Sequence, residues 1–230
     1  MIRRDKAVAL LLSAIPALLL FLAVRQPAIA AEKPVAAPAA TLQAKEDGLQ
    51  TAIFAGGCFW GVEGVFSHTR GVTSAVSGYH GGTQADATYK KVSAGGTRHA
   101  EVVKVTYDPK VVRYDQLLRI FFSVVADPTT LNYQGPDHGA HYRTALVPMN
   151  EDQGKVAAAY IAQLDKAKLW PKRIVTRVEA YKAFYPAETY HQDFMKKNPG
   201  QGYIVRWDMP KVAALKRLYP AHYRATFKRG

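Results

Sequence analysis

Hydrophobic and polar residues after residue 49 follow two periods, one typical of strands and one typical of helices. The clearest strand covers residues 101–107, where Glu101 shares one face with Val103 and Val105, and Asp108-Pro109 ends the run. The clearest amphipathic helix has apolar residues at spacings of three and four, namely Leu117, Leu118, Phe121, Phe122 and Val125. The pattern therefore predicts a domain that mixes both kinds of element.

The other predicted elements complete the order β-α-β-β-α-β. Residues 127–141 read as a long polar loop, and the residues after 197 contain several Pro and Gly with little periodicity. We expect an α+β fold, a ferredoxin-like split β-α-β two-layer sandwich with C-terminal additions and a coil tail. The remaining strands are expected at residues 51–55, 72–78, 143–147 and 174–179, and the remaining helices from residue 58, at 152–168 and near 188–197.

The first thirty residues have the pattern of an export signal. Three basic residues precede an apolar run over residues 7–24, and Ala28-Ile29-Ala30 matches the site that signal peptidase cleaves. We predict a signal peptide at residues 1–30 and a periplasmic or secreted protein. Because the apolar run is close to the length that spans a bilayer, an uncleaved N-terminal membrane anchor is the alternative.

The rest of the chain is predicted as one domain behind a tether. Residues 31–48 are rich in Ala, Pro and charge without an apolar period, so we expect a flexible linker. Residues 49–230 are long enough to bury one sizeable core, and 48% of the whole chain is hydrophobic.

The chain is strongly basic. Its formal net charge of +13 falls to +10 without residues 1–30, because that segment holds four basic side chains and one acidic one. The basic residues gather only in the C-terminal tail, and no nucleic-acid motif accompanies them. We therefore interpret them as a solvated basic face and expect no nucleic-acid partner, while a non-catalytic basic binding module is a separate hypothesis.

Cys58 is the only cysteine of the 230 residues, which is unusual for an exported protein, where cysteines are usually paired. It follows Gly56 and Gly57 at the point where a strand is expected to give way to a helix. The free N–H groups and the dipole of a helix N-terminus lower the pKa of a thiol from about 8.5, so we expect a reactive Cys58. A buried, inert thiol is the alternative.

Several blocks of sequence, in order, resemble the peptide methionine sulfoxide reductase A family. The resemblance runs from about Thr51 to Pro199 and begins with the segment that contains the cysteine. The blocks are Gly57–Glu63, Gly78–Gly82, Thr88–Val92, His99–Val103, Gln134–Gly139 with Tyr142–Thr144, and Ala187–Gln192.

This resemblance implies thiol-dependent reduction of methionine S-sulfoxide in peptides and proteins, a repair reaction after oxidation. Cys58 would attack the sulfoxide sulfur, and the oxygen must then take up a proton. The resemblance makes Glu101 the proton donor. Burial on a strand face with Val103 and Val105 would raise its pKa and keep it protonated near neutral pH.

The resemblance also implies a set of substrate-binding residues. Two phenols would donate hydrogen bonds to the sulfoxide oxygen, two aromatic rings would receive the S-methyl group, and one carboxylate would position the substrate. Tyr89 and Tyr142 are the phenols, Phe59 and Trp60 are the aromatic rings, and Asp137 is the carboxylate.

The sequence departs from the family in its tail. Many relatives carry a resolving cysteine after an Asn-Pro and a Gly-Tyr stretch, but here Gly202-Tyr203 leads to Ile204. We therefore expect a sulfenic acid on Cys58, no internal disulfide, no bound cofactor, and an external thiol reductant, either a small thiol or a thioredoxin-like protein.

Two other kinds of chemistry are compatible with parts of the pattern. Cys58 with His191 and Asp137 would suit a cysteine-dependent hydrolase or acyltransferase, although the residues around Cys58 do not match a papain-type motif. Asp137, His138 and His141 could bind a metal, but no further ligand supports such a site, and we expect none. His191 matches a family position near the site, but we do not predict it as catalytic.

Overall fold

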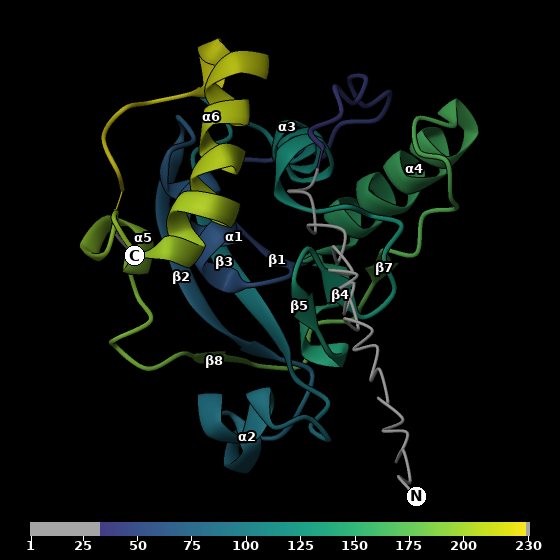
Figure 1. Ribbon diagram of the computed structural model, residues 1–230. Coiled ribbons are helices and arrows are strands. Elements are labelled where there is room, and N and C mark those ends of the chain that lie inside the picture. Colours follow the sequence, from purple (N-terminus) through teal and green to yellow (C-terminus); the bar gives the residue numbers. More distant parts are fainter. Residues whose placement is uncertain (1–32, 229–230) are drawn as a thin grey trace, which may run out of the picture.

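Six strands form one central sheet in residues 33–228, the part of the protein that the computed structural model describes (Figure 1). Their order across the sheet is β7-β6-β1-β3-β2-β8, and all neighbours are antiparallel except β6 and β7. The predicted signal peptide lies outside the described residues. The strands are β1 (Gln50–Gly56), β2 (Val72–His80), β3 (Ala100–Tyr107), β6 (Thr144–Val147), β7 (Arg177–Val178) and β8 (Phe184–Pro186).

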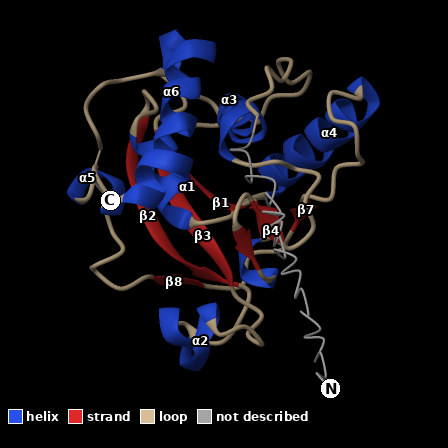
Figure 2. Cartoon of the chain, viewed as in Figure 1, coloured by secondary structure: helices blue, strands red, loops and turns tan. Residues whose placement is uncertain are grey.

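Helices pack against this sheet, with α1 directly in front of it (Figure 2). No helix within residues 33–228 has the length and apolar character needed to span a bilayer. The α-helices are α1 (Phe59–Ser67), α2 (Tyr89–Ser93), α3 (Tyr114–Ile120), α4 (Glu151–Ala167), α5 (Phe194–Lys197) and α6 (Met209–Leu218). Shorter pieces are the 3₁₀ turns Gln84–Asp86, Ala140–Tyr142 and Pro220–His222, the π turns Phe121–Val125 and Ile204–Asp208, and the small ladder of β4 (Tyr133–Gln134) and β5 (Asp137–His138).

The predicted α+β class with a split β-α-β arrangement is confirmed. Strands β1 and β2 are joined through α1, and β3 lies between them, antiparallel to both. Strand β6 pairs with the other edge of β1 after the chain has formed α3. This is the topology expected when two β-α-β units interleave their strands in one sheet.

Alternate residues of β1 enter two different cores. Ala52 and Phe54 belong to the main core, which also contains the buried side chains of α1 and α3. Ile53 and Ala55 point to the opposite face and join a smaller cluster, against which Phe184 of β8 packs. The two-residue period of the strand thus produces one large helical layer and one thin, partly covered face.

The prediction of a coil tail is wrong. The chain after α5 forms the π turn Ile204–Asp208 and the ten-residue helix α6, which packs on α1. Pro210, one of the prolines of this segment, occupies the first turn of α6, where no backbone N–H is needed. Ile204 and Leu215 are fully buried and hold this segment in the main fold.

The described part of the predicted flexible linker is also fixed in place. Residues 33–48 contain no helix or strand, but the backbone N–H of Val35 donates to the carbonyl of Ser123 at 3.0 Å. Ala37 is completely buried, and Glu46 accepts hydrogen bonds from the hydroxyl of Tyr107 and from the backbone of Tyr114. This extended stretch is held by contacts with distant segments. Such contacts produce no periodic pattern in the sequence.

Two predicted elements are much shorter than expected. Only Arg177–Val178 of the expected strand at 174–179 forms a strand, because the backbone N–H groups of Ile174 and Val175 donate to Asp165 and Pro128 outside the sheet. Only Phe194–Lys197 of the expected helix at 188–197 is α-helical. Asp193 interrupts that helix, since its φ of +56° lies in the left-handed region.

Candidate active site

Cys58 lies at the junction of β1 and α1, where the sequence predicts it. It caps the N-terminus of α1 and is half-buried. Gly57 makes the preceding turn possible: its φ is +85°, and a Cβ atom there would lie 2.6 Å from the Cβ of Gln134. The thiol therefore sits on a turn that only glycine can form without moving a neighbour.

Glu101, the second residue of β3, is buried directly beside this turn. Its Oε2 accepts a hydrogen bond from the backbone N–H of Phe59 at 3.0 Å, and its side chain is 2% exposed. Burial raises the pKa of Glu101 to about 8, against the opposing effect of that hydrogen bond. The expected shift is thus confirmed, and Glu101 is a neutral acid at pH 7.

The direction of the shift predicted for Cys58 is wrong. Burial, followed by the negative charges of Glu101, Asp208 and Asp137, raises the thiol pKa well above its ordinary value. The backbone N–H of Trp60 at the start of α1 lowers the pKa, but burial and charge outweigh this helix-end contribution. Cys58 therefore keeps its proton at neutral pH. Any negative charge on Glu101 makes loss of that proton less favourable.

The two aromatic residues after Cys58 have different surroundings. Phe59 is 1% exposed and belongs to the main core. The half-buried indole of Trp60 stacks on Phe194 with ring centroids 3.7 Å apart, and the ring of Tyr203 meets its edge. Its indole N–H donates to Nδ1 of His191 at 3.1 Å. Trp60 is thus the less buried member of the pair.

Tyr89 and Tyr142 approach the same centre from opposite parts of the chain. Tyr89 begins α2, and Tyr142 ends the 3₁₀ turn Ala140–Tyr142. Burial, followed by the charges of Glu101 and Cys58, raises the pKa of both phenols. Both therefore remain neutral hydrogen-bond donors throughout the ordinary pH range.

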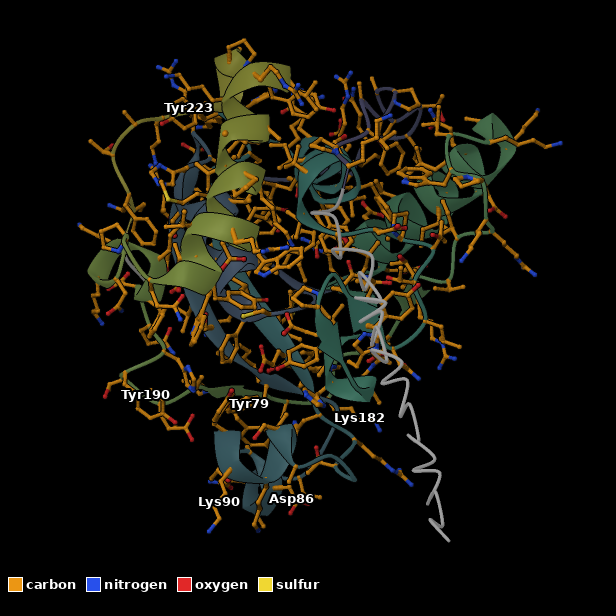
Figure 3. The ribbon with its side chains drawn as sticks, in the orientation of Figure 1. Tyr79, Asp86, Lys90, Lys182, Tyr190 and Tyr223 are labelled. Atoms are coloured by element: carbon orange, nitrogen blue, oxygen red, sulfur yellow. The ribbon has the colours of Figure 1, made fainter. Side chains whose placement is uncertain are left out.

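Glu188 holds α2 against the sheet from below the site. Its carboxylate accepts hydrogen bonds from the hydroxyl of Tyr79 at 2.9 Å and from the backbone N–H of Tyr89 at 2.8 Å. Figure 3 shows Tyr79 above α2, with Tyr190 on the neighbouring segment that follows β8. Glu188 belongs to the Ala187–Gln192 block, and the sequence pattern indicates no role for it.

The C-terminal tail supplies site residues that the sequence analysis missed. Tyr203 donates a hydrogen bond to Oδ2 of Asp137, which offsets part of the rise that burial causes in the pKa of Asp137. A narrow cavity of about 10 Å³ is lined by Cys58, Gln134, Gly135, Pro136, Asp137, Tyr203, Trp207 and Lys211. Lys211 of α6, a helix that the coil prediction excludes, thus contributes to one wall of the site.

The arrangement does not favour the alternative chemistries. Nδ1 of His191 is bonded to Trp60 and Asp137 is bonded to Tyr203, so no His–Asp pair is formed for a hydrolase. The ring of His138 stacks on that of Tyr133, and the ring of His141 lies against that of Tyr142 at a tilt. Within residues 33–228, no group of three or more His, Cys, Asp or Glu side chains is placed to hold a metal ion.

The model of the peptide methionine sulfoxide reductase family matches residues 50–222, which include every residue of this site. The chain belongs to this family. A relative from Mesorhizobium japonicum, named peptide methionine sulfoxide reductase MsrA 2, is 58% identical over 176 residues, covering 76% of this chain and 90% of the relative. A protein of the same name from a Synechocystis species is 47% identical over 178 residues, covering 77% of this chain and 83% of that protein.

Solved structures of the family share the fold. Reduced Mxr1 from Saccharomyces cerevisiae is 34% identical, with a TM-score of 0.63 over 70% of this chain and 92% of that chain. Methionine sulfoxide reductase A of Corynebacterium diphtheriae is 30% identical, with a TM-score of 0.57 over 74% and 88% of the two chains. The mixed fold with its mostly antiparallel sheet is therefore that of known methionine sulfoxide reductases.

The turn at Gly57 yields a first prediction. Gly95 is a matched control, since its φ of +80° is close to that of Gly57 but a Cβ atom there would meet nothing within 4 Å. Gly95→Ala should lower the free energy of unfolding by about 1–2 kcal/mol through its backbone alone. Gly57→Ala should lower it by about 1–3 kcal/mol more, because the turn must also move away from Gln134. Denaturant unfolding measures both, and equal losses in the two variants would contradict the close contact.

Proposed function

We propose that this protein reduces the S-epimer of methionine sulfoxide in peptides and proteins, with Cys58 as nucleophile and Glu101 as proton donor. Family membership supports the oxidoreductase activity on methionine sulfoxide. The assignment of Cys58 as nucleophile and Glu101 as proton donor rests on one observation. The Glu101 carboxyl is buried and accepts a hydrogen bond from the backbone N–H of Phe59, next to Cys58. The S-epimer follows from the resemblance to the A-type enzymes, because each epimer has its own enzyme.

Cys58 and Glu101 are best treated as a coupled pair. Negative charge on Glu101 raises the pKa of Cys58, so a thiolate and a carboxylate together are unfavourable. Since both pKa values are raised, both groups hold a proton at pH 7, and Cys58 must lose its own to the solvent before it attacks. A bound sulfoxide favours the form with a Cys58 thiolate and a Glu101 acid, because its oxygen accepts a hydrogen bond from the carboxylic acid while its sulfur faces the thiolate.

The reaction can then be written with all atoms accounted for. The Cys58 thiolate forms a bond to the substrate sulfur, and Glu101 transfers its proton to the sulfoxide oxygen. Neutral Tyr89 and Tyr142 donate hydrogen bonds to that oxygen as its charge changes. The hydroxyl group passes to the Cys58 sulfur and the sulfur–sulfur bond breaks, so methionine is reduced by two electrons and Cys58 is oxidised to a sulfenic acid.

An external thiol must complete the cycle, because Cys58 is the only cysteine among the 230 residues. The first thiol condenses with the sulfenic acid, releases water and forms a mixed disulfide. A second thiol attacks that disulfide and restores Cys58. Small thiols and thioredoxin-like proteins both supply this chemistry.

The proton donor can be tested through the pH dependence of the rate. Because the pKa of Glu101 is about 8 and its acid form is the active one, its contribution is complete at lower pH and is lost as pH rises through about 8. Glu101→Gln should lower the reduction rate by about 10²- to 10⁴-fold at pH 7. The ratio of wild-type to variant rates should then fall above about pH 8, where the wild type loses its proton donor.

Glu63 offers a matched control. It is also fully buried, its pKa is likewise raised to about 8, and it accepts hydrogen bonds from the backbone N–H of Asp193. Glu63→Gln should retain the alkaline loss of activity that Glu101→Gln removes. A Glu101→Gln enzyme with the wild-type rate and pH profile would remove Glu101 from the mechanism, and activity in Cys58→Ser would remove Cys58.

The absence of a second cysteine predicts a defined stoichiometry. Enzyme mixed with excess sulfoxide and no reductant should form about one methionine per Cys58 and then stop, with Cys58 captured by a sulfenate-specific reagent. Addition of dithiothreitol to the same sample should restore turnover, which shows that the enzyme remains intact. Repeated turnover before the thiol is added, or unmodified Cys58 after the burst, would disprove the sulfenic acid route.

We also propose that residues 1–30 export the protein to the periplasm or the medium, where the mature chain begins at Ala31. The pattern of basic, apolar and small residues in that segment supports this proposal. N-terminal sequencing of the full chain after expression should find Ala31. Ala30→Arg should block cleavage, whereas Ala39→Arg, at an exposed position beyond the cut, should not. An intact Met1 in membrane-bound wild-type protein would instead show an anchor.

A further inference from the structure

His191 is a buried imidazole that the reaction scheme does not use. It lies between β8 and α5, and its side chain accepts the indole N–H of Trp60 at Nδ1, 3.1 Å away. The residue is 2% exposed, and its ring centroid lies 4.9 Å from that of Phe59 and 4.5 Å from that of Tyr89. His191 thus touches three residues of the site without lining the cavity beside Cys58.

The hydrogen bond with Trp60 determines the form of this imidazole. An indole N–H can only donate, so Nδ1 must carry a lone pair and the single proton of the neutral ring must be on Nε2. Protonation would place a second N–H on Nδ1, directly opposite the indole N–H. The hydrogen bond therefore exists only while His191 is neutral.

The surroundings of His191 keep it neutral near pH 7. Burial lowers its pKa, and the negative charge of Glu188 opposes this effect only in part. The other titratable groups against the ring are the phenols of Tyr89 and Tyr190, which are uncharged at this pH. Glu188 is itself occupied by hydrogen bonds from Tyr79 and Tyr89.

We propose that neutral His191 is a positioning residue that orients the indole of Trp60 as a wall for the substrate's S-methyl group, and that protonation of His191 releases this wall. The proposal rests on the proposed function, because it assigns Trp60 to substrate binding. Phe194 covers one face of the indole by stacking, and His191 fixes the rotation of the ring within that stack. Without an acceptor, the partly buried indole N–H would have to turn towards water.

The sign of the pH effect follows from the hydrogen bond. His191 is neutral above its pKa, so Trp60 is held in place at neutral and alkaline pH. Because burial lowers the pKa of His191, the bond is lost only as pH falls below the ordinary range of a histidine, and KM for the sulfoxide should then rise. Because Trp60 contacts the substrate and not the transferred proton, kcat should change less than KM.

Two substitutions of His191 separate the hydrogen bond from simple packing. In His191→Asn the side-chain oxygen occupies nearly the place of Nδ1 and accepts the indole N–H, but it cannot be protonated. KM should stay within about twofold of the wild-type value at pH 7.5 and lose its rise between pH 7 and 5. In His191→Leu the acceptor is absent, and KM should be about 5- to 30-fold higher at every pH.

His222 provides the control, since it is a half-buried imidazole in the turn Pro220–His222 whose pKa burial also lowers. His222→Asn should leave the acid rise of KM unchanged. Identical pH profiles of KM for wild type and His191→Asn, or an unchanged KM in His191→Leu, would overturn the proposal.

A second measurement does not depend on activity. The ring ¹⁵N signals of His191 should show a protonated Nε2 and an unprotonated Nδ1 at pH 7.5, and the Nδ1 signal should shift in Trp60→Phe. A protonated Nδ1 would overturn the assignment of His191 even if His191→Leu fails to fold. Wild-type protein that reduces no sulfoxide at any pH would refute the proposed function, whereas the ¹⁵N signals would still decide the hydrogen bond.

Discussion

The hydrogen bond from the backbone N–H of Phe59 to Glu101 joins the first turn of α1 to β3, and the rest of the site depends on it. A backbone N–H favours the charged form of a carboxyl, but the burial that this position imposes has the larger effect. Burial therefore keeps Glu101 protonated, while the hydrogen bond places it beside the residue that follows Cys58. Moving Glu101 outward would remove both.

The C-terminal tail packs closely against this site because α1 has glycines where the two segments meet. A Cβ atom on Gly61 would lie 2.3 Å from Oδ1 of Asp208, and one on Gly64 would lie 2.2 Å from the terminal methyl carbon of Met195. These glycines let α5 and the turn before α6 approach the helix backbone closely. Tyr203 and Trp207 then reach the cavity beside Cys58. The C-terminal tail, which lacks a periodic sequence pattern, thus forms a wall of the site because glycines let it pack close to α1.

The parts of the fold that the sequence predicts are those with local causes. The alternation around Val103 and the apolar spacing after Leu117 correspond to β3 and to α3 with its π turn. The burial of Glu101 follows from its strand face. The direction of the pKa shift of Cys58 does not, because it depends first on burial in the folded site and then on the charges of Glu101, Asp208 and Asp137, which lie far along the chain. Tyr203 was missed for the same reason, since only the folded tail brings it to Asp137.

The replacement of the family's resolving cysteine by Ile204 changes what the tail can do. A thiol at such a position must be able to travel to Cys58, which requires a tail with loose packing. Ile204 is fully buried, and it starts a helical segment whose Leu215 and Tyr219 are also buried. Removing this isoleucine side chain from its contacts would cost several kcal/mol, on the order of 2–5 for such core truncations. The burial of Ile204 and Leu215 thus makes the tail a packed wall of the site, which agrees with the proposal that the second thiol comes from outside.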